Sequence, residues 1–401
     1  MTAIATSQST VPPANRTFPG WPVFTAAQID AVGSVLKSGK VNYWTGSVVK
    51  EFEKEYAAHL GVKHAVAVFN GTIALELIVR AMGIGPGDEV VVPPRTFVAT
   101  ATSVMWNGAR PVFADIDPVS GNVTADTIRA VVTPRAKAVI VVHLAGWPCD
   151  MDPIMALAAE KNLKIIEDCA QSHGAEYHGR KTGAIGHAAA LSFCQDKIIT
   201  TGGEGGLIAT NDNELWNRIW SLKDHGKSYD AVFNRQHPPG FRWLHEGLGT
   251  NGRMTEMQAA IGRDALKCLP DWLARRTENA QAYAQVLTGV PAVTLSQPPA
   301  GIRPAYYRYY AQLQRNRLPR DWTRDRIMNT VAAAGYPCFS GSCCEIYQEK
   351  AFEKLRPAHR LPAASAMSLD SLCFLTHPTL TPADCAEIAG AVRRLLEVLV
   401  R

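Results

Sequence analysis

The stretch Ala65-Val66-Ala67-Val68-Phe69-Asn70-Gly71-Thr72-Ile73-Ala74-Leu75 changes within a few residues from a strand into a helix. Its first four residues form a short apolar run, which small polar residues then end before helix-forming residues follow. A helix that begins directly after a buried strand points unpaired backbone N–H groups and the positive end of its dipole outward. This arrangement suits a phosphate. The stretch therefore predicts a strand–helix unit with an anion site at the end of the strand.

Further apolar strands alternate with helical segments on the C-terminal side. We predict strands at 89–92, 110–114, 138–142 and 164–167, with helices over 72–82, 97–106, from 125 and over 152–161. Two helices, 25–37 and 48–60, precede them. Because the strands are continuously apolar, they indicate a mostly parallel sheet that is buried on both faces. Ligands of such sheets bind outside the carboxyl ends of the strands.

The pattern changes after about residue 263. A helix to residue 287, a Pro-rich link, a strand over 306–314 and helices over 325–333 and 382–400 indicate a smaller α+β region. We therefore expect a large α/β domain over residues 17–262 and a small domain over residues 263–401. Residues 1–16 are rich in Ser, Thr and Pro and lack the pattern of a signal peptide, so we expect a disordered arm.

An acid and a lysine stand beyond the predicted phosphate site. Asp168 follows the apolar run Lys164–Glu167, and Lys197 lies in a turn of small residues before the glycine-rich stretch Gly202–Gly206. Pyridoxal phosphate (PLP) requires these groups, an amine that forms a Schiff base with its aldehyde and a carboxylate that binds its pyridinium nitrogen. A solvated lysine and a helix-capping aspartate are the alternatives for each residue alone. Phosphate site, acid and amine together predict a PLP enzyme.

The chain resembles the DegT/DnrJ family of PLP-dependent nucleotide-sugar aminotransferases, which have the fold-type I architecture of the aspartate aminotransferase superfamily. The resemblance runs from about Phe18 to the C-terminal helix. Six segments carry it: Asn70–Leu75, Gly85–Val90, Thr96–Thr100, Glu167–Gln171, Ser192–Phe193 with Lys197, and Leu248–Ala259. Members with histidine in place of the lysine dehydrate sugars instead, so Lys197 favours amino transfer.

The resemblance implies roles around the cofactor ring. Lys197 is the Schiff-base lysine and proton shuttle, and Asp168 keeps the pyridine nitrogen protonated. Gln171 donates a hydrogen bond to the phenolic oxygen. Phe97 stacks on the ring face, although the residue type also suits an ordinary core position.

The resemblance also implies how the phosphate is held. The N–H groups of Gly71 and Thr72 and the hydroxyl of Ser192 bind it, joined by Asn251 from a partner subunit. This arrangement implies a homodimer with shared active sites. Ser192 as a strand-end hydroxyl and Asn251 as a turn former are the alternatives.

The family commonly has Thr-Thr-Gly-Glu-Gly-Gly after the lysine, whereas this chain has one more residue in Gly202-Gly203-Glu204-Gly205-Gly206. Glu204 is therefore either a substrate contact or a loop carboxylate held by glycine N–H groups.

The expected reaction moves an amino group from glutamate, or glutamine, to a keto group of a nucleotide-linked deoxysugar in amino-sugar biosynthesis. An aminotransferase of a free cyclitol ketone such as scyllo-inosose is the alternative, and a non-catalytic PLP-binding regulator is a remote one. The candidate cationic contacts for a nucleotide are Arg253, His225, Arg308, Lys223 and Lys227. The alternative for each is a solvated surface charge. We expect substrate selection in loops such as 40–46 and 339–347.

Composition narrows the partners. The net charge of +5 is spread without a polybasic run, which argues against nucleic acid and suits small anionic ligands. No apolar run approaches the roughly 20 residues that span a bilayer. Nine cysteines without zinc-ligand spacing predict reduced thiols and no metal site. We infer a cytoplasmic protein that does not bind membranes.

Overall fold

The central sheet of the protein has seven strands. A computed structural model describes residues 11–236, 240 and 243–400. The strand order is β1 (His64–Val68), β9 (Gly206–Thr210), β8 (Ala188–Ser192), β5 (Lys164–Asp168), β4 (Ala136–Val142), β2 (Glu89–Val92) and β3 (Arg110–Phe113). Only β9 pairs antiparallel, with β1 on one side and β8 on the other. The predicted α/β fold with a mostly parallel sheet is confirmed.

Alternate side chains of each strand enter different hydrophobic cores on the two faces of the sheet. In β1, Val66 and Val68 pack with α3 (Gly71–Ala81), whereas Ala65 and Ala67 pack with α2 (Val48–Leu60). Both faces are therefore covered, as continuously apolar strands require. Helices that share the first core are α4 (Ala99–Trp106) and α7 (Asn213–Lys223), and α5 (Ala125–Arg129), α6 (Met151–Lys161) and α11 (Pro362–Asp370) flank a third core.

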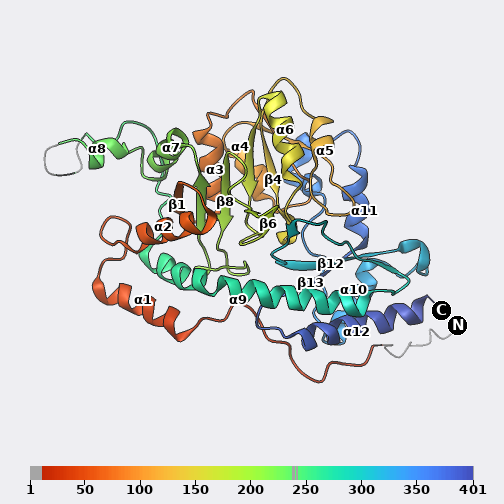
Figure 1. Cartoon of the computed structure of the whole chain (residues 1–401). Coiled ribbons are helices and arrows are strands. Elements are labelled where there is room, and N and C mark those ends of the chain that lie inside the picture. Colours follow the sequence, from red (N-terminus) through yellow and green to blue (C-terminus); the bar gives the residue numbers. More distant parts are fainter. Residues whose placement is uncertain (1–10, 237–239, 241–242, 401) are drawn as a thin grey trace.

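The C-terminal region has a core of its own. Its three-stranded sheet has the order β10 (Val293–Thr294), β12 (Arg308–Leu313) and β13 (Ser371–Leu375), flanked by α10 (Arg324–Ala333) and α12 (Pro382–Leu399). Helix α9 (Glu256–Leu287) runs along both regions (Figure 1). The predicted domain boundary at 262/263 falls inside α9, so the chain crosses between the regions within one continuous helix. The division into two domains stays a prediction.

The remaining elements are short or peripheral. Helix α1 (Ala26–Ser38) begins at the predicted capping box of Thr25 and Gln28 and ends at Gly39, whose left-handed φ of 68° suits glycine. A small sheet joins β11 (Ile302–Arg303), β6 (Glu176–Tyr177) and β7 (Arg180–Lys181), and α8 (Tyr229–Phe233) follows α7. Four short 3₁₀ helices complete the described elements: η1 (Leu144–Gly146), η2 (Arg315–Arg317), η3 (Ile346–Gln348) and η4 (Lys350–Leu355).

The predicted disordered arm is wrong for residues 11–16, and residues 1–10 lie outside the described part. Val11 is 1% exposed in the C-terminal core, and the Ala14 N–H donates a hydrogen bond to the Ala334 carbonyl at 2.8 Å. Arg16 pairs with Asp384 and Glu387 of α12. Burial of an apolar side chain thus outweighs the ordering cost, which two prolines after Val11 reduce.

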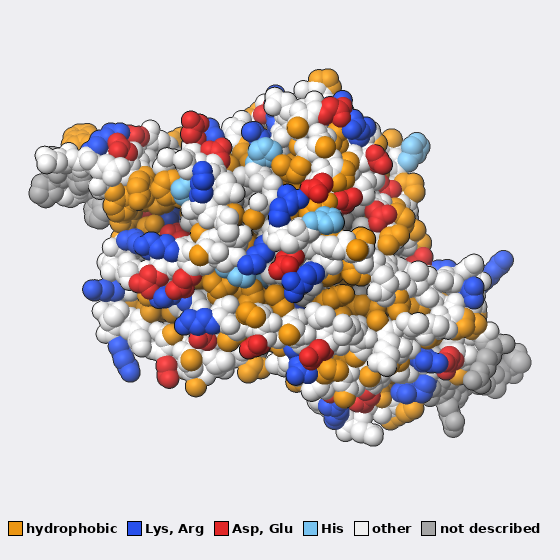
Figure 2. All heavy atoms as spheres, viewed as in Figure 1, with side chains coloured by type: hydrophobic (Ala, Val, Ile, Leu, Met, Phe, Trp, Pro, Cys, Tyr) orange, Lys and Arg blue, Asp and Glu red, His pale blue; other side chains and the backbone are white. Residues whose placement is uncertain are grey.

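The surface agrees with the charge pattern of the sequence. On the face that Figure 2 shows, Lys and Arg side chains are interspersed with Asp and Glu and do not form one basic patch. Among the described residues, no helix combines the length and apolarity needed to cross a membrane. All nine cysteines are free thiols. The cytoplasmic location stays a prediction.

Candidate active site

The predicted site residues lie at the carboxyl end of the parallel strands. Asp168 is the last residue of β5 and Ser192 the last residue of β8, while Gly71 follows β1 and Phe97 follows β2. A cavity of about 620 Å³ opens there and is lined by Phe97, Gln171 and Lys197. Side chains up to 100 positions apart in the sequence therefore border one space.

Lys197 presents its amine to this cavity. Its side chain is 18% exposed, and Nζ lies 3.3 Å from Oδ1 of Asp196 and 5.2 Å from the ring centroid of Tyr307. Burial alone lowers the pKa of Lys197, but electrostatic interactions with Tyr307 and Asp196 outweigh it, so the pKa is above its ordinary value. In this protonated state the amine is a proton donor that its ion pair with Asp196 holds in place. Nucleophilic attack requires that it first give up a proton.

Trp21 fixes the backbone of Lys197 from behind. Its indole N–H donates a hydrogen bond to the Lys197 carbonyl at 2.9 Å. The Trp21 ring packs edge-on against Trp272 with centroids 5.1 Å apart, and the guanidinium carbon of Arg276 lies 5.7 Å from the Trp21 ring centroid. The N-terminal segment thus contributes directly to the turn that carries the amine, which the sequence analysis missed.

Asp168 is held as a buried carboxylate. It is 6% exposed, and its oxygens accept hydrogen bonds from the Thr100 hydroxyl at 2.9 Å and the Ala170 N–H at 3.2 Å. Burial raises the pKa of Asp168, and these two hydrogen bonds together with Lys197 and His143 only partly oppose it. A cationic N–H group against this carboxylate would relieve that penalty, as a protonated pyridine nitrogen does.

The phosphate site predicted at the start of α3 has the required donors. The Asn70 side chain caps the helix by accepting from the Ile73 N–H at 2.9 Å, and the N–H groups of Gly71 and Thr72 precede the first intrahelical donor, the Ala74 N–H, which bonds to the Asn70 carbonyl. A Cβ at Gly71 would lie 2.7 Å from Cβ of Ser192 and 3.2 Å from its Oγ. The absence of a side chain at Gly71 therefore lets the Ser192 hydroxyl approach the helix N-terminus.

The strand register brings these groups together. Gly206 pairs with Val68 of β1 on one side and with Ser192 of β8 on the other. A Cβ at Gly206 would lie 2.3 Å from the backbone carbon of Asn70, so a larger residue there would push the start of α3 away. Part of the glycine-rich stretch after Lys197 thus serves the phosphate site.

Phe97 and Gln171 border the cavity above Asp168. Phe97 is 69% exposed, which rules out the ordinary core position. Gln171 accepts a hydrogen bond from the Ala145 N–H through Oε1 at 2.7 Å. Because the oxygen is occupied, the NH₂ group remains as donor, and a phenolate oxygen requires a donor. An exposed ring, an amide donor, a buried carboxylate, an amine and a glycine-backed helix N-terminus fit PLP.

Two lining residues, Asp196 and Tyr307, extend the predicted site. Asp196, next to Lys197, accepts from the Tyr307 hydroxyl and lies 3.4 Å from Nη2 of Arg308. Arg308 was predicted as a substrate contact, and it does line the cavity. The loop at 339–343 and Ile346 line it as well, in agreement with the expected specificity loop at 339–347, whereas no residue of 40–46 does so.

Other predicted substrate contacts lie elsewhere in the single chain. Arg253 donates to Oδ1 of Asp224 at 2.8 Å, and Lys227 binds the same oxygen at 3.0 Å. Lys223 is fully buried, with Nζ 3.7 Å from the ring centroid of Tyr43. His225 is exposed, and its backbone N–H donates a hydrogen bond to the Thr250 carbonyl. Two of these cations thus bind Asp224, and none of the four lines the cavity within one chain.

Glu204 and Asn251 are exposed. The Glu204 carbonyl accepts from Thr201 and Gln258, while its carboxylate lies 3.9 Å from Sγ of Cys194 and outside the cavity lining. Gly202 and Gly203 both have positive φ, 90° and 123°, so the additional residue is absorbed in a turn that suits glycine. Asn251 forms an isolated antiparallel β-bridge with Asp224. The carbonyl of neighbouring Gly252 accepts a hydrogen bond from the Phe69 N–H at 2.8 Å.

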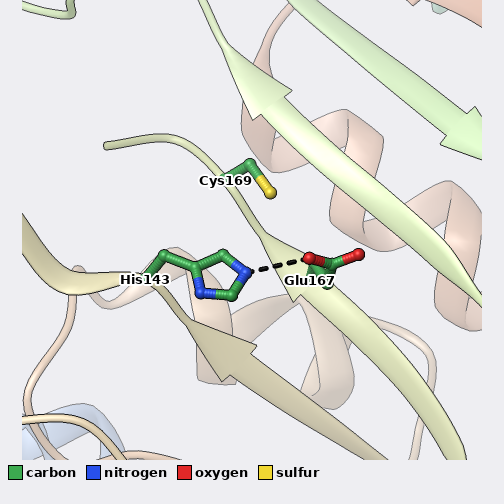
Figure 3. A group of neighbouring side chains, drawn as sticks. All are labelled: His143, Glu167 and Cys169. Carbon is green, nitrogen blue, oxygen red and sulfur yellow. Dashed lines mark hydrogen bonds and ion pairs between the residues drawn. The ribbon is translucent and has the colours of Figure 1, made fainter. Parts of the chain in front are cut away.

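A cluster of His143, Glu167 and Cys169 lies beneath the site (Figure 3). These three residue types could form a metal site, but the lone pairs of Glu167 and His143 already accept hydrogen bonds. Glu167 accepts from His143 Nε2 at 3.0 Å and from the N–H groups of Gly183, Ile185 and Gly186 at 2.7–2.9 Å. His143 Nδ1 accepts from the Cys149 N–H at 3.0 Å. Although burial raises the pKa of Glu167, the His143 bond and these N–H groups lower it below its ordinary value. The cluster is a structural network that supports β5.

Comparisons with known proteins agree with this site. The profile of the DegT/DnrJ/EryC1/StrS aminotransferase family matches residues 23–393. GDP-perosamine synthase of Caulobacter vibrioides is 39% identical over 88% of this chain and 92% of its own length. UDP-N-acetyl-3-dehydro-alpha-D-glucosamine 3-aminotransferase of Acidithiobacillus ferrooxidans is 35% identical over 92% and 93%.

A solved structure is also closely similar. The aminotransferase from Psychrobacter cryohalolentis superposes with a TM-score of 0.94 at 50% identity, covering 96% of this chain and all of that one. Its similarity extends through the C-terminal region as well as the central sheet. The chain belongs to the DegT/DnrJ/EryC1/StrS aminotransferase family and is a PLP-dependent aminotransferase.

Proposed function

We propose that this aminotransferase moves an amino group from glutamate, or glutamine, to a keto group of a nucleotide-linked deoxysugar in amino-sugar biosynthesis. The observation that carries the proposal is the Lys197 amine at a cavity of about 620 Å³, close enough to the buried Asp168 carboxylate to interact with its charge, at the sheet edge where α3 also begins. The names of the relatives, which include GDP- and UDP-linked sugars, support this substrate class.

The chain's own residues supply binding, orientation and proton transfer. PLP, when bound, accepts the amino group and withdraws electron density from the carbon that loses a proton. Gly71, Thr72 and Ser192 would hold its phosphate, Asp168 would hold the proton on the pyridine nitrogen, and Phe97 would cover one ring face. Lys197 Nζ would carry the proton between the substrate carbon and the cofactor carbon, and Asp196 at 3.3 Å would orient the amine.

Arg308 is the cation that we assign to the substrate side. It is the one predicted substrate cation that lines the cavity, and its side chain is 18% exposed. Its guanidinium carbon lies 4.3 Å from the Tyr307 ring centroid, which holds the group in place beside the entrance to Lys197. An anionic or polar group of the sugar substrate is its expected partner.

We further propose a homodimer that completes each site. Phe97 at the cavity and Phe69 beside the phosphate site are 69% and 47% exposed, and Leu248, on the same loop as Asn251, is 83% exposed, so apolar surface is left for a partner to cover. Asn251 and the cations around Asp224 would then reach the partner's site. The alternative is that Asn251 acts in its own chain, since the adjacent Gly252 already contacts Phe69.

A substrate screen tests the function. The purified holoenzyme, given glutamate or glutamine, is offered UDP-, dTDP- and GDP-linked keto-sugars and scyllo-inosose, and formation of the keto acid and the amino product is followed by mass spectrometry. We expect turnover with a nucleotide-linked keto-sugar. Turnover with scyllo-inosose alone would assign the cyclitol reaction instead, and no ketone-dependent consumption of either donor would favour a regulator.

A further inference from the structure

A second, smaller cavity adjoins the active-site cavity. It has a volume of about 50 Å³ and is lined by Arg95, Arg308, Tyr310, Ala145 and Tyr306, among others. Arg308 and Tyr310 line both cavities. A space of this size holds a single ion or a carboxylate group but no sugar or nucleotide.

Arg95 brings a full positive charge into this cavity without a counter-charge. It is 2% exposed, and among the described residues no carboxylate lies within 4.0 Å of its guanidinium. Its two hydrogen bonds go to weak or distant acceptors, Sδ of Met367 at 3.3 Å and Oγ of Ser371 at 3.5 Å. Nε is buried without any partner. Because an arginine does not lose its proton in a protein, the charge persists.

The surroundings of Arg95 compensate its charge only in part. The guanidinium carbon lies 4.5 Å from the Tyr310 ring centroid, a favourable cation–π contact. A buried cation nevertheless needs a paired anion or several strong acceptors to offset its lost hydration. Arg308, the second guanidinium at the cavity, adds positive charge, and its own carboxylate partner Asp196 is shared with Lys197.

The backbone around the cavity is held in an unfavourable conformation. Ala145 and Tyr306 have left-handed φ values of 57° and 44°, which side chains with a Cβ rarely adopt. The two segments are joined, since the Tyr307 N–H donates to the Ala145 carbonyl at 2.8 Å. Ala145 also donates to Gln171 of the active site. Strain of this kind persists where the surrounding structure maintains a functional geometry.

We propose that this cavity binds a small monovalent anion, either a halide ion or a carboxylate group, with Arg95 as its principal ligand and Arg308 as the link to the active site. Two sources share this chemistry. A resident ion would neutralise Arg95 and fix Tyr310, whereas a substrate carboxylate would reach the site from the larger cavity past Arg308.

Bromide is the probe. The holoenzyme is prepared in MES buffer, whose sulfonate is too bulky for the cavity, and its thermal unfolding is measured against bromide at constant ionic strength. We expect a saturable rise of the midpoint by roughly 2–4 °C in the wild type. Arg95→Met should lose the saturable part, Arg95→Lys should retain some of it, and Arg110→Met, at an exposed position on β3, should behave as wild type. Crystals grown in bromide should show an anomalous peak beside Arg95.

Kinetics with glutamate identify the source. If bromide competes with glutamate and Arg95→Met raises the KM for glutamate, the natural occupant is a substrate carboxylate. If the KM for glutamate is unchanged in Arg95→Met, the natural occupant is a resident ion. The proposal is overturned if crystals in bromide show no peak beside Arg95, or if the bromide stabilisation is unchanged in Arg95→Met. Neither readout involves amino transfer, so this failure is distinct from a failure of the proposed function.

Discussion

Asp168 and Lys197 reach the site from different strand ends, and burial disfavours the charge of both, but their neighbours lead to opposite outcomes. Loss of hydration raises the pKa of Asp168, and its neighbours only partly oppose this, whereas Tyr307 and Asp196 overcome burial to keep the Lys197 amine protonated. The cofactor-free site therefore has a carboxylate that needs a cation and an amine that must lose a proton to react. PLP satisfies both requirements.

Asp168→Asn should lower turnover at least about a hundredfold, which corresponds to ~2.7 kcal/mol of transition-state stabilisation. Asparagine keeps the size of the side chain but cannot hold a proton on the pyridine nitrogen by charge. The measurement is kcat under saturating substrates with PLP content determined by absorbance, and Asp126→Asn, at an exposed position on α5, is the control. Near-normal turnover with PLP bound would remove Asp168 from this role.

Sequence identified the site residues whose chemistry is local. Asp168, Lys197 and Gly71 stand in motifs that predict their place at strand ends, and the structure brings them there. Trp21 and Asp196 were missed because their contacts join segments far apart in the chain or depend on a side-chain direction. The cations Lys227 and Arg253 have the right charge for a nucleotide, yet residue type alone did not reveal Asp224 as their partner.

At the scale of elements, strands β1 to β5 were predicted closely and β8 and β9 were not. The run Ala188–Ser192 is rich in alanine and the run Gly206–Thr210 begins with glycine, residues that strands disfavour. Their position between other strands decides their conformation. Small side chains are required here, since Gly206 has room for no Cβ against Asn70.

Trp21→Phe tests the contact between the N-terminal segment and the lysine turn. Phenylalanine keeps an aromatic ring against Trp272 but removes the indole N–H that donates to the Lys197 carbonyl. A neutral hydrogen bond contributes about 1 kcal/mol, so we expect kcat to fall about fivefold with little change in KM. Wild-type kinetics in Trp21→Phe, equal to those of the exposed control Trp106→Phe, would leave Trp21 with a packing role only.

His173 predicts how stability responds to acid. Its Nε2–H donates to the Ser192 carbonyl at 2.8 Å, and Nδ1 accepts from the Tyr56 hydroxyl at 2.6 Å, so the buried ring is neutral. Burial lowers the pKa of His173 from 6.5 to about 3. Between these values the unfolded chain binds a proton that the folded chain does not, so stability falls as pH decreases.

The expected loss is at most about 1.4 kcal/mol of unfolding free energy for each pH unit below 6.5. Urea denaturation from pH 7 to pH 4.5 measures it. His173→Gln should flatten this dependence, while His245→Gln, at an exposed position, should not. An equal pH slope in wild type and His173→Gln would contradict the assignment.

At the scale of the whole molecule, the proposed dimer explains why predicted contacts lie away from the cavity of their own chain. Asn251 stands at an exposed position on the loop before α9 that also exposes Leu248, and Phe97 is exposed at the cavity, whereas Asp224 and Lys223 are buried in their own chain. Closed two-fold symmetry would place each such loop at the partner's site.

Subunit exchange tests this arrangement. Asn251→Asp should weaken cofactor binding through repulsion between its carboxylate and the phosphate, and Lys197→Ala should be inactive. In mixed dimers one site carries both defects and the other carries neither, so activity should return although each parent lacks it. If exchange is verified and no activity returns, Asn251 acts within its own chain.

The identity of the reactive lysine is the central claim. Holoenzyme reduced with borohydride and digested should yield one PLP-labelled peptide, with the label on Lys197. Lys197→Ala should fold, retain some PLP through its phosphate and ring contacts, and yield no label. A label on another lysine, or borohydride-trapped PLP that persists in Lys197→Ala, would contradict the account.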